Sequence, residues 1–117
     1  MRRRTVVGAT DPRGIRVRLQ DDQWARIVAK RPIIEPYRRE VLRAVAEPDA
    51  IIQSKQRHDA HLYYAVRHLA VGAQEAADRY VVVVVQLDDL SLRKGRVNTA
   101  WIGNRPPKGR VLWRRSP

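Results

Sequence analysis

Polar side chains that could act on a phosphodiester recur at every second position in three short stretches of the chain. Seven of them lie in GIRVRLQ, HLYYAVRHL and RVNTAWIG: Arg16, Arg18, His61, Tyr63, Arg67, Thr99 and Trp101. Guanidinium groups bind phosphate oxygens in a bidentate fork, and aromatic rings stack on unpaired bases for about 1–3 kcal/mol each. An imidazole beside a cation can promote attack of a ribose 2′-hydroxyl on its own phosphate. These residue types predict an RNA site.

Each residue has an expected role in such a site. We expect His61 to move the proton and Thr99 to position the scissile phosphate, with Arg67 stabilising charge. Arg16 and Arg18 would hold phosphates along the strand. Tyr63 and Trp101 would stack on bases.

No metal ion or other cofactor is predicted. Metal-dependent phosphodiester chemistry needs clustered carboxylates, and none occurs among these residues. His58 and His61 in HDAH would point to opposite faces of a strand, with no third ligand in the pattern.

The same residues also have purely structural interpretations. His61 is compatible with an ordinary surface position on a strand. Tyr63 and Trp101 suit cross-strand packing, and Thr99 is a good strand former. Arg67 could simply pair with an acid.

The elements that would position these residues follow from periodicity and breakers. Alternation predicts strands near 14–20, 61–68 and 96–103, with shorter ones near 49–54 and 110–113. A helix from 61 onward is the alternative for the second of these. Apolar residues at helical spacing, bounded by prolines, predict helices over 21–32 and 35–48. We expect an α+β domain, with two helices on one face of a four- or five-stranded antiparallel sheet.

Strand parity then predicts which residues share a face. The apolar positions would face the helices: Ile15, Val17, Leu19, Leu62, Tyr64, Val66, Ala100 and Ile102. The seven polar and aromatic residues would share the other face. RYVVVVVQL, at 79–87, is typical of a strand buried on both faces and therefore central.

Positive charge is concentrated at the two ends of the chain. The net charge is +12 in total, and it is carried by residues 1–20 and 93–117, while residues 21–92 are nearly neutral. We expect one domain over 1–117, with a basic N-terminal arm at 1–13 and a basic C-terminal tail at 104–117. Such a field favours a polyanionic partner, above all RNA.

The chain lacks features of secreted or membrane-spanning proteins. It has no cysteine, which suits a reducing compartment such as the cytoplasm. The basic start MRRRTVVGATDP is followed by too short an apolar run for a signal peptide. No membrane partner is expected.

Five motifs in order resemble one nuclease family: VRLQDDQWARIVAKRP, EVLRAVAEPDAII, LYY, YVVVVV and VNTAW. Over about residues 17–101 they are similar to the phage barnase–EndoU–colicin–RelE-like nucleases, small toxin-like ribonuclease domains. The resemblance implies a barnase/RelE-like fold and an RNA-cleaving activity. Thr99 matches the threonine of the family's Thr-Ala-Tyr motif, which reads Thr-Ala-Trp here.

Two departures from the family pattern concern histidines. Arg26 stands where the family has a helix histidine, and Arg31 stands before Pro32 where the family has His-Pro. An arginine binds phosphate and stabilises charge but does not act as a base.

The sequence therefore predicts a metal-independent endoribonuclease, toxin-like or phage-derived. Arg26 is a candidate catalytic residue and Arg31 a candidate phosphate ligand. The alternatives are an inactive RNA- or DNA-binding module, or an interaction domain for an acidic antitoxin or immunity protein.

Overall fold

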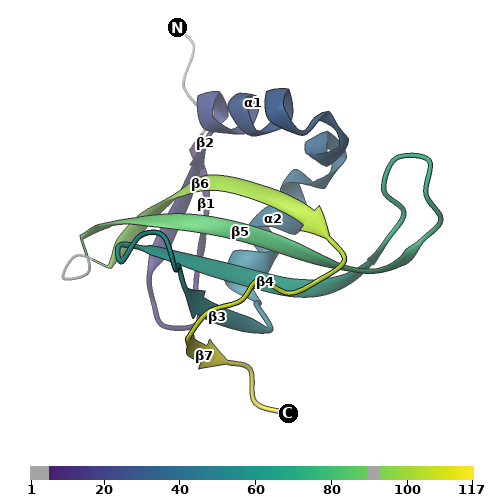
Figure 1. Cartoon of the computed structure of the whole chain (residues 1–117). Coiled ribbons are helices and arrows are strands. Elements are labelled where there is room, and N and C mark those ends of the chain that lie inside the picture. The colour runs from purple at the N-terminus through teal and green to yellow at the C-terminus, as the bar shows by residue number, and fades with distance from the viewer. Residues whose placement is uncertain (1–5, 90–92) are drawn as a thin grey trace, which may run out of the picture.

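The computed structural model describes residues 6–89 and 93–117 as a single curved sheet with helices on one side (Figure 1). In chain order the elements are β1 (Val6–Thr10), β2 (Arg16–Gln20), α1 (Asp21–Lys30), the 3-10 helix η1 (Pro32–Tyr37), α2 (Arg38–Ala46), β3 (Ala50–Gln53), β4 (Ala60–Leu69), β5 (Ala77–Asp89), β6 (Lys94–Gly103) and β7 (Val111–Arg114).

The sheet has seven strands in the order β1-β2-β6-β5-β4-β3-β7, and it is mixed. All neighbours pair antiparallel except β2 and β6, which run parallel from Arg16–Arg18 against Lys94–Arg96. The prediction of a four- or five-stranded antiparallel sheet of the barnase/RelE kind is therefore wrong.

The missed strand β1 explains much of that error. VVGAT at 6–10 is short, contains Gly8 and follows a run of arginines, so no strand pattern stands out. In the structure β1 forms a hairpin with β2 and occupies one of its edges. The other edge of β2 is left for β6. The described part of the expected N-terminal arm, residues 6–13, thus forms β1 and the turn after it.

The two predicted helices form where their apolar residues recur. α1 begins with Asp21 and Asp22, whose charges favour a helix N-terminus, and it buries Trp24 and Ile27. The second predicted helix is divided at its start. Pro36 lies in η1, and α2 begins only at Arg38, because proline lacks an amide hydrogen and restricts the preceding residue.

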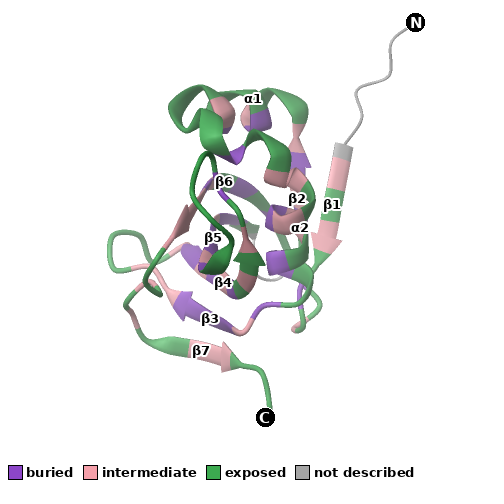
Figure 2. Cartoon of the chain, turned by 90° about the vertical axis from the view of Figure 1, so that its right-hand side faces the viewer, coloured by how far each residue is buried: buried purple, intermediate pink, exposed green. Residues whose placement is uncertain are grey.

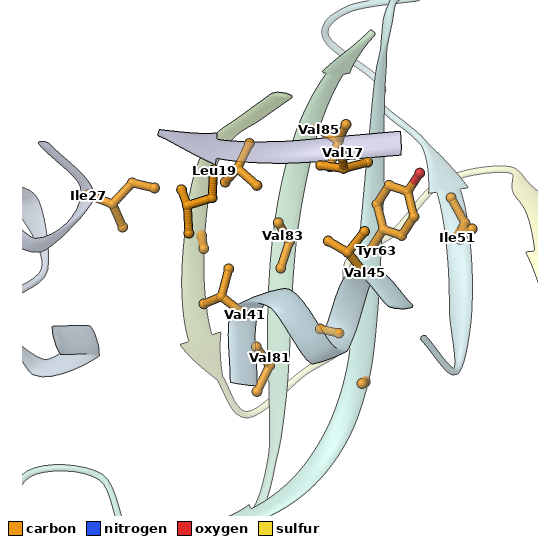
Figure 3. Close-up of a cluster of buried hydrophobic side chains, with 14 of the residues drawn as sticks. Val17, Leu19, Ile27, Val41, Val45, Ile51, Tyr63, Val81, Val83 and Val85 are labelled. Atoms are coloured by element: carbon orange, nitrogen blue, oxygen red, sulfur yellow. The ribbon is translucent and has the colours of Figure 1, made fainter. Parts of the chain in front are cut away.

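The apolar core lies between α2 and the inner face of the sheet (Figure 3). Val41 and Val45 of α2 are fully buried, as are Val81 and Val83 of β5. Figure 2 shows the buried residues concentrated in the central strands and in β3, while α1 is largely exposed. No helix within residues 6–89 and 93–117 is long and apolar enough to cross a membrane.

The other face of the sheet is crossed by the segment 104–110, which joins β6 to β7 on the far side of β3 (Figure 1). This crossover is anchored by a backbone hydrogen bond, in which the main-chain N–H of Gln53 donates to the Arg110 carbonyl at 2.8 Å. A Cβ at Gly109 would lie 2.5 Å from the Gln53 carbonyl oxygen, so the two backbones touch. The outer face is therefore partly covered, and Val82 and Ile52 are buried there.

The prediction of which β4 residues face the helices is wrong. Tyr63 and Ala65 face the helices and are fully buried, whereas Leu62, Tyr64 and Val66 lie on the outer face. Two facts reverse the simple rule that the larger apolar residues face the helices. The small Ala65 leaves room for α2, and the crossover shelters part of the outer face.

Neighbouring isoleucines of η1 provide a test of this packing. Ile34 is 1% exposed and Ile33 is 49% exposed. We expect Ile34→Ala to lower the free energy of unfolding by about 2–5 kcal/mol, because it leaves a cavity in the core. Ile33→Ala should stay within about 0.5 kcal/mol of the unmodified protein. Urea unfolding of both variants measures the difference, and equal effects would contradict this packing.

Candidate nucleic-acid interface

The outer face of the sheet, opposite α2, carries two cross-strand rows of side chains. Leu62, Val84 and Thr99 are directly paired across β4, β5 and β6. The second row places Val82 beside Trp101. Directly paired residues share a face, so Thr99 and Trp101 both lie on the outer face, as their parity predicts.

A β-bulge sets the direction of Thr99. Val85 pairs with Val97 and Val84 pairs with Thr99, which leaves Asn98 as an extra residue in β6. The bulge lets Val97 and Ala100 both face the core, where each is at most 1% exposed, while Thr99 turns outward. It explains why a polar residue interrupts the apolar pattern of this strand.

Helix α1 lies beside β6 next to this bulge. The ladder between β2 and β6 ends at Arg18 and Arg96, so β6 has a free edge beyond that point. α1 contacts β6 there, and the Gln23 side-chain amide donates to the Asn98 carbonyl. Thr99 consequently lies at the seam between the helix and the outer face.

A hollow of about 620 Å³ occupies the seam; we call it the α1 hollow. Its cationic lining comes from the second half of α1 and the residue that follows it: Arg26, Lys30 and Arg31. Gln23, Asn98 and Thr99 complete the polar lining. Arg26 is exposed because it points away from the buried Trp24 and Ile27 of the same helix.

A second hollow of about 350 Å³ lies on the other side of Thr99, between the β3–β4 loop and the crossover; we call it the crossover hollow. Asn98 and Thr99 line it as well, so the two hollows meet at the bulge. Its floor is apolar, formed by Leu62, Val84 and Trp101. Lys55, Arg57 and Lys108 stand around it.

The β3–β4 loop is held in place by the half-buried side-chain amide of Gln53. The Gln53 side-chain nitrogen lies 3.1–3.4 Å from the carbonyl oxygens of Ser54, Arg57, His58 and Ala60. Arg57 is also steadied by Asp59, which accepts from its Nε at 3.3 Å and from the Gln86 amide. The loop cations are thus presented from a fixed backbone.

Arg31 and Trp101 connect the two hollows. The guanidinium carbon of Arg31 lies 5.9 Å from the centre of the Trp101 ring, a cation–π arrangement. The contact orients the guanidinium group of Arg31 beside the seam. It also keeps the indole ring on the outer face.

The charge of the two hollows is of one sign. Of the residues that the structure describes, six cations line them and no carboxylate or imidazole does. Among the described residues, of these six only Arg57 forms an ion pair, with Asp59. Such a surface attracts polyanions and binds phosphate groups.

Three predicted site residues lie on the wrong face for this surface: His61, Tyr63 and Arg67. Arg67 lies under α2, where its Nε is 3.7 Å from Glu40 Oε2 and its Nη2 donates to the Glu47 carbonyl. All three lie on one face of β4, so reversing the predicted inward and outward faces of this strand misplaces them together. His61 and Thr99 are separated by the sheet, so His61 does not reach a phosphate at Thr99.

His61 and Tyr63 belong to a buried polar network under the β1–β2 turn. Asp11 is the centre: its Oδ2 accepts from the Tyr63 hydroxyl at 2.6 Å and from Arg13 Nη2 at 3.0 Å. Its Oδ1 accepts from the backbone amides of Arg13 and Ile15. Arg13 Nη2 also lies 3.0 Å from His61 Nδ1. This network ties the turn to β4.

The network shifts the titration of both ring side chains. Burial, followed by the nearby Arg13 charge, lowers the pKa of His61 to about 4. Arginine only donates, so His61 Nδ1 accepts and the ring is neutral. Burial and the hydrogen bond to Asp11 raise the pKa of Tyr63 well above its ordinary value. Neither side chain changes its protonation state near neutral pH.

The remaining predicted residues distribute along the outer face. Arg26, Arg31, Thr99 and Trp101 are brought together around the two hollows. Arg16 and Arg18 lie farther along, on the β1–β2 hairpin. Within residues 6–89 and 93–117, no cluster of His, Asp and Glu is suited to hold a metal ion.

Four cations of the site were missed by the sequence: Lys30, Lys55, Arg57 and Lys108. Lys30 is four residues after Arg26, and helical spacing could have placed it on the same side. The loop residues carry no such signal. Their position depends on the crossover, which no local pattern reveals.

Comparison of the chain with protein-family models, with curated proteins and with solved structures finds no match.

His61 makes a prediction about stability against pH. Its pKa is about 6.5 when unfolded and about 4 when folded, so the unfolded chain binds more protons in between. Stability is full above pH 6.5 and falls as the pH drops toward 4, by about 3 kcal/mol. In His61→Asn the side-chain oxygen still accepts from Arg13 but does not titrate. We expect its unfolding free energy to lose that part of the pH dependence.

His68→Asn is the matched control, because the His68 side chain is 68% exposed. Urea unfolding between pH 4 and pH 7 measures all three proteins. An unchanged slope in His61→Asn would show that the buried imidazole is not the titrating group.

Proposed function

We propose that the outer face binds single-stranded RNA and cleaves it without a metal ion at a phosphate held beside Thr99. The α1 hollow takes the phosphate, and the crossover hollow takes the adjoining base. This division follows the linings: cations and amides on one side of Thr99, an apolar floor with Trp101 on the other. A cytoplasmic site of action belongs to the same proposal.

The observation that carries the proposal is convergence. Thr99 matches a motif residue of the phage barnase–EndoU–colicin–RelE-like nucleases that this chain resembles, and Arg26, Arg31 and Trp101 stand where that pattern has two histidines and a tyrosine. They are spread over 76 residues of sequence, yet all four line hollows that meet at one bulge. The motifs and the geometry thus support the same place.

The proposed reaction is an internal transfer. The ribose 2′-oxygen attacks the neighbouring phosphorus, and the bond from phosphorus to the 5′-oxygen breaks. The 2′-hydroxyl proton goes to a solvent hydroxide or water, and the leaving 5′-oxygen takes a proton from water. The products are a 2′,3′-cyclic phosphate and a 5′-hydroxyl end.

The protein's contribution is electrostatic. Arg26, Lys30 and Arg31 stabilise the extra negative charge that develops on the phosphate oxygens in the transition state. Thr99 donates a hydrogen bond to the same group and fixes its position. Lys108 and Arg57 hold the next phosphate on the side of the crossover hollow.

A binding-only function is the second candidate. The absence of an imidazole and a carboxylate from the linings of both hollows favours it, because general acid–base groups are usually drawn from these side chains. In that case the same contacts bind RNA without turnover.

Substitutions at the seam test cleavage. Thr99→Val keeps the shape of the side chain but removes its hydroxyl, and Arg26→Ala removes one charge from the phosphate. We expect each to lower the rate of cleavage of single-stranded RNA in excess chelator by about 10²-fold or more. Gel analysis of end-labelled RNA, with identification of the cyclic phosphate, measures the rate.

His61→Asn and Arg39→Ala provide the controls, because they alter the inner network and the outside of α2 respectively. Both should cleave as the unmodified protein does at pH 7. Loss of cleavage in His61→Asn with intact folding would return the site to the inner face. RNA binding without any cleavage would leave the binding function alone.

The pH profile of cleavage separates this chemistry from histidine catalysis. With hydroxide as the base, the rate should rise about tenfold per pH unit from pH 6 to pH 8, because no histidine or carboxylate of the described residues lines the seam. Single-turnover cleavage rates, measured between pH 6 and pH 8 at constant ionic strength, give the pH profile. A plateau or a bell centred between pH 6 and pH 7 would contradict it.

A further inference from the structure

A third hollow, of about 460 Å³, lies on the outer surface of the β1–β2 hairpin, beyond the seam. We infer that it binds phosphates of the same RNA strand away from the reacting nucleotide, so that the substrate is an extended single strand. This inference rests on the proposed function, and it adds a separate subsite, which we call the hairpin subsite.

The hairpin subsite is built from cations on paired strands. Thr10 pairs with Arg16, and Arg16 pairs with Lys94, so the three form one row on one face. The next row begins with Gly8, which pairs with Arg18. A Cβ at Gly8 would lie 2.6 Å from the Val17 carbonyl oxygen, so the two strand backbones approach closely beside the arginines. No carboxylate of the described side chains, 7–88 and 93–117, lines the hollow.

Arg16 and Lys94 are available to a ligand. Both are exposed, and neither forms an ion pair with the described side chains at 7–88 and 93–117. The backbone under Arg16 is fixed, because its amide donates to the Arg93 carbonyl at 2.9 Å. Two exposed cations thus stand side by side on paired strands.

A fourth, smaller hollow of about 200 Å³ joins this subsite to the seam. It shares Arg18 with the hairpin subsite. It shares Gln23, Arg26 and Asn98 with the α1 hollow. The hollows therefore form one continuous path from the hairpin to Thr99.

Asp88 organises the junction of this path. Its Oδ2 lies 2.8 Å from Arg18 Nη2, and its Oδ1 accepts from Arg96. One carboxylate thus holds two guanidinium groups side by side and leaves a net positive charge between them. A phosphate passing along the path meets donors at this point.

The length of the path decides the substrate class. Lys94 and Thr99 are five positions apart in β6, which is about 16 Å at the usual rise of a strand. One nucleotide does not contact both ends. A ligand that uses the hairpin subsite and the seam together must be a polymer.

The test compares a dinucleotide with a single strand of about 12 nucleotides, a length typical of single-strand binding sites. Binding to each is measured over a range of salt concentrations. The variant is Arg16→Ala with Lys94→Ala. The control is Arg39→Ala with Arg43→Ala, which removes two exposed charges from α2. The expected result is a salt slope for the long strand lowered by about 1.4 in the variant, at about 0.7 per phosphate contact. We expect the variant to bind the dinucleotide as the unmodified protein does. We expect the control variant to keep the salt slope of the unmodified protein for the long strand.

Three outcomes overturn the inference: a long-strand slope unchanged in the variant, an equal loss in the control, or an equal loss for the dinucleotide. Failure of the proposed function looks different, because the unmodified protein would then bind neither RNA. Polyglutamate is the probe for an acidic protein partner. If it binds through Arg16 and Lys94 while RNA does not bind, the surface belongs to such a partner.

Discussion

The central strand β5 is buried on both faces, and the rest of the structure follows from that constraint. Val81, Val83 and Val85 pack against the helix layer, and Val82 is fully buried on the opposite side. One helix layer cannot cover both faces of a strand. The crossover 104–110 covers the second face, and it also forms one wall of the crossover hollow. The valine run and the candidate site therefore have a common cause.

The site itself depends on how β6 ends its pairing with β2. Beyond Arg96 the edge of β6 is free, and a free edge exposes backbone groups that need partners. The bulge at Asn98 and the helix α1 solve this problem together, with Gln23 bonding the bulge carbonyl. The consequence is that Arg26 of α1 and Arg31, directly after the helix, lie beside Thr99. A structural requirement at an edge thus creates a cationic seam.

Much of the local structure could be predicted from the sequence, and most of the tertiary structure could not. Both helices, the central strand and the outward direction of Thr99 and Trp101 follow from spacing and from breakers. β1 was missed, and the parallel pairing of β2 with β6 depends on it. The face of β4 was reversed because His61 and Tyr63 satisfy Asp11 and Arg13 inside the protein. A polar residue on a strand does not reveal whether its partner is water or a buried carboxylate.

The central claim is that RNA lies on the outer face of the sheet and not on the helix face. Amide chemical shifts recorded while single-stranded RNA is added test this most directly. The account predicts shifts at Gln23–Arg31, Lys55–Arg57 and Asn98–Trp101, with Arg38–Ala46 and Arg67 unaffected. Shifts confined to α2 and to Arg67 would place the ligand on the opposite face and contradict the account.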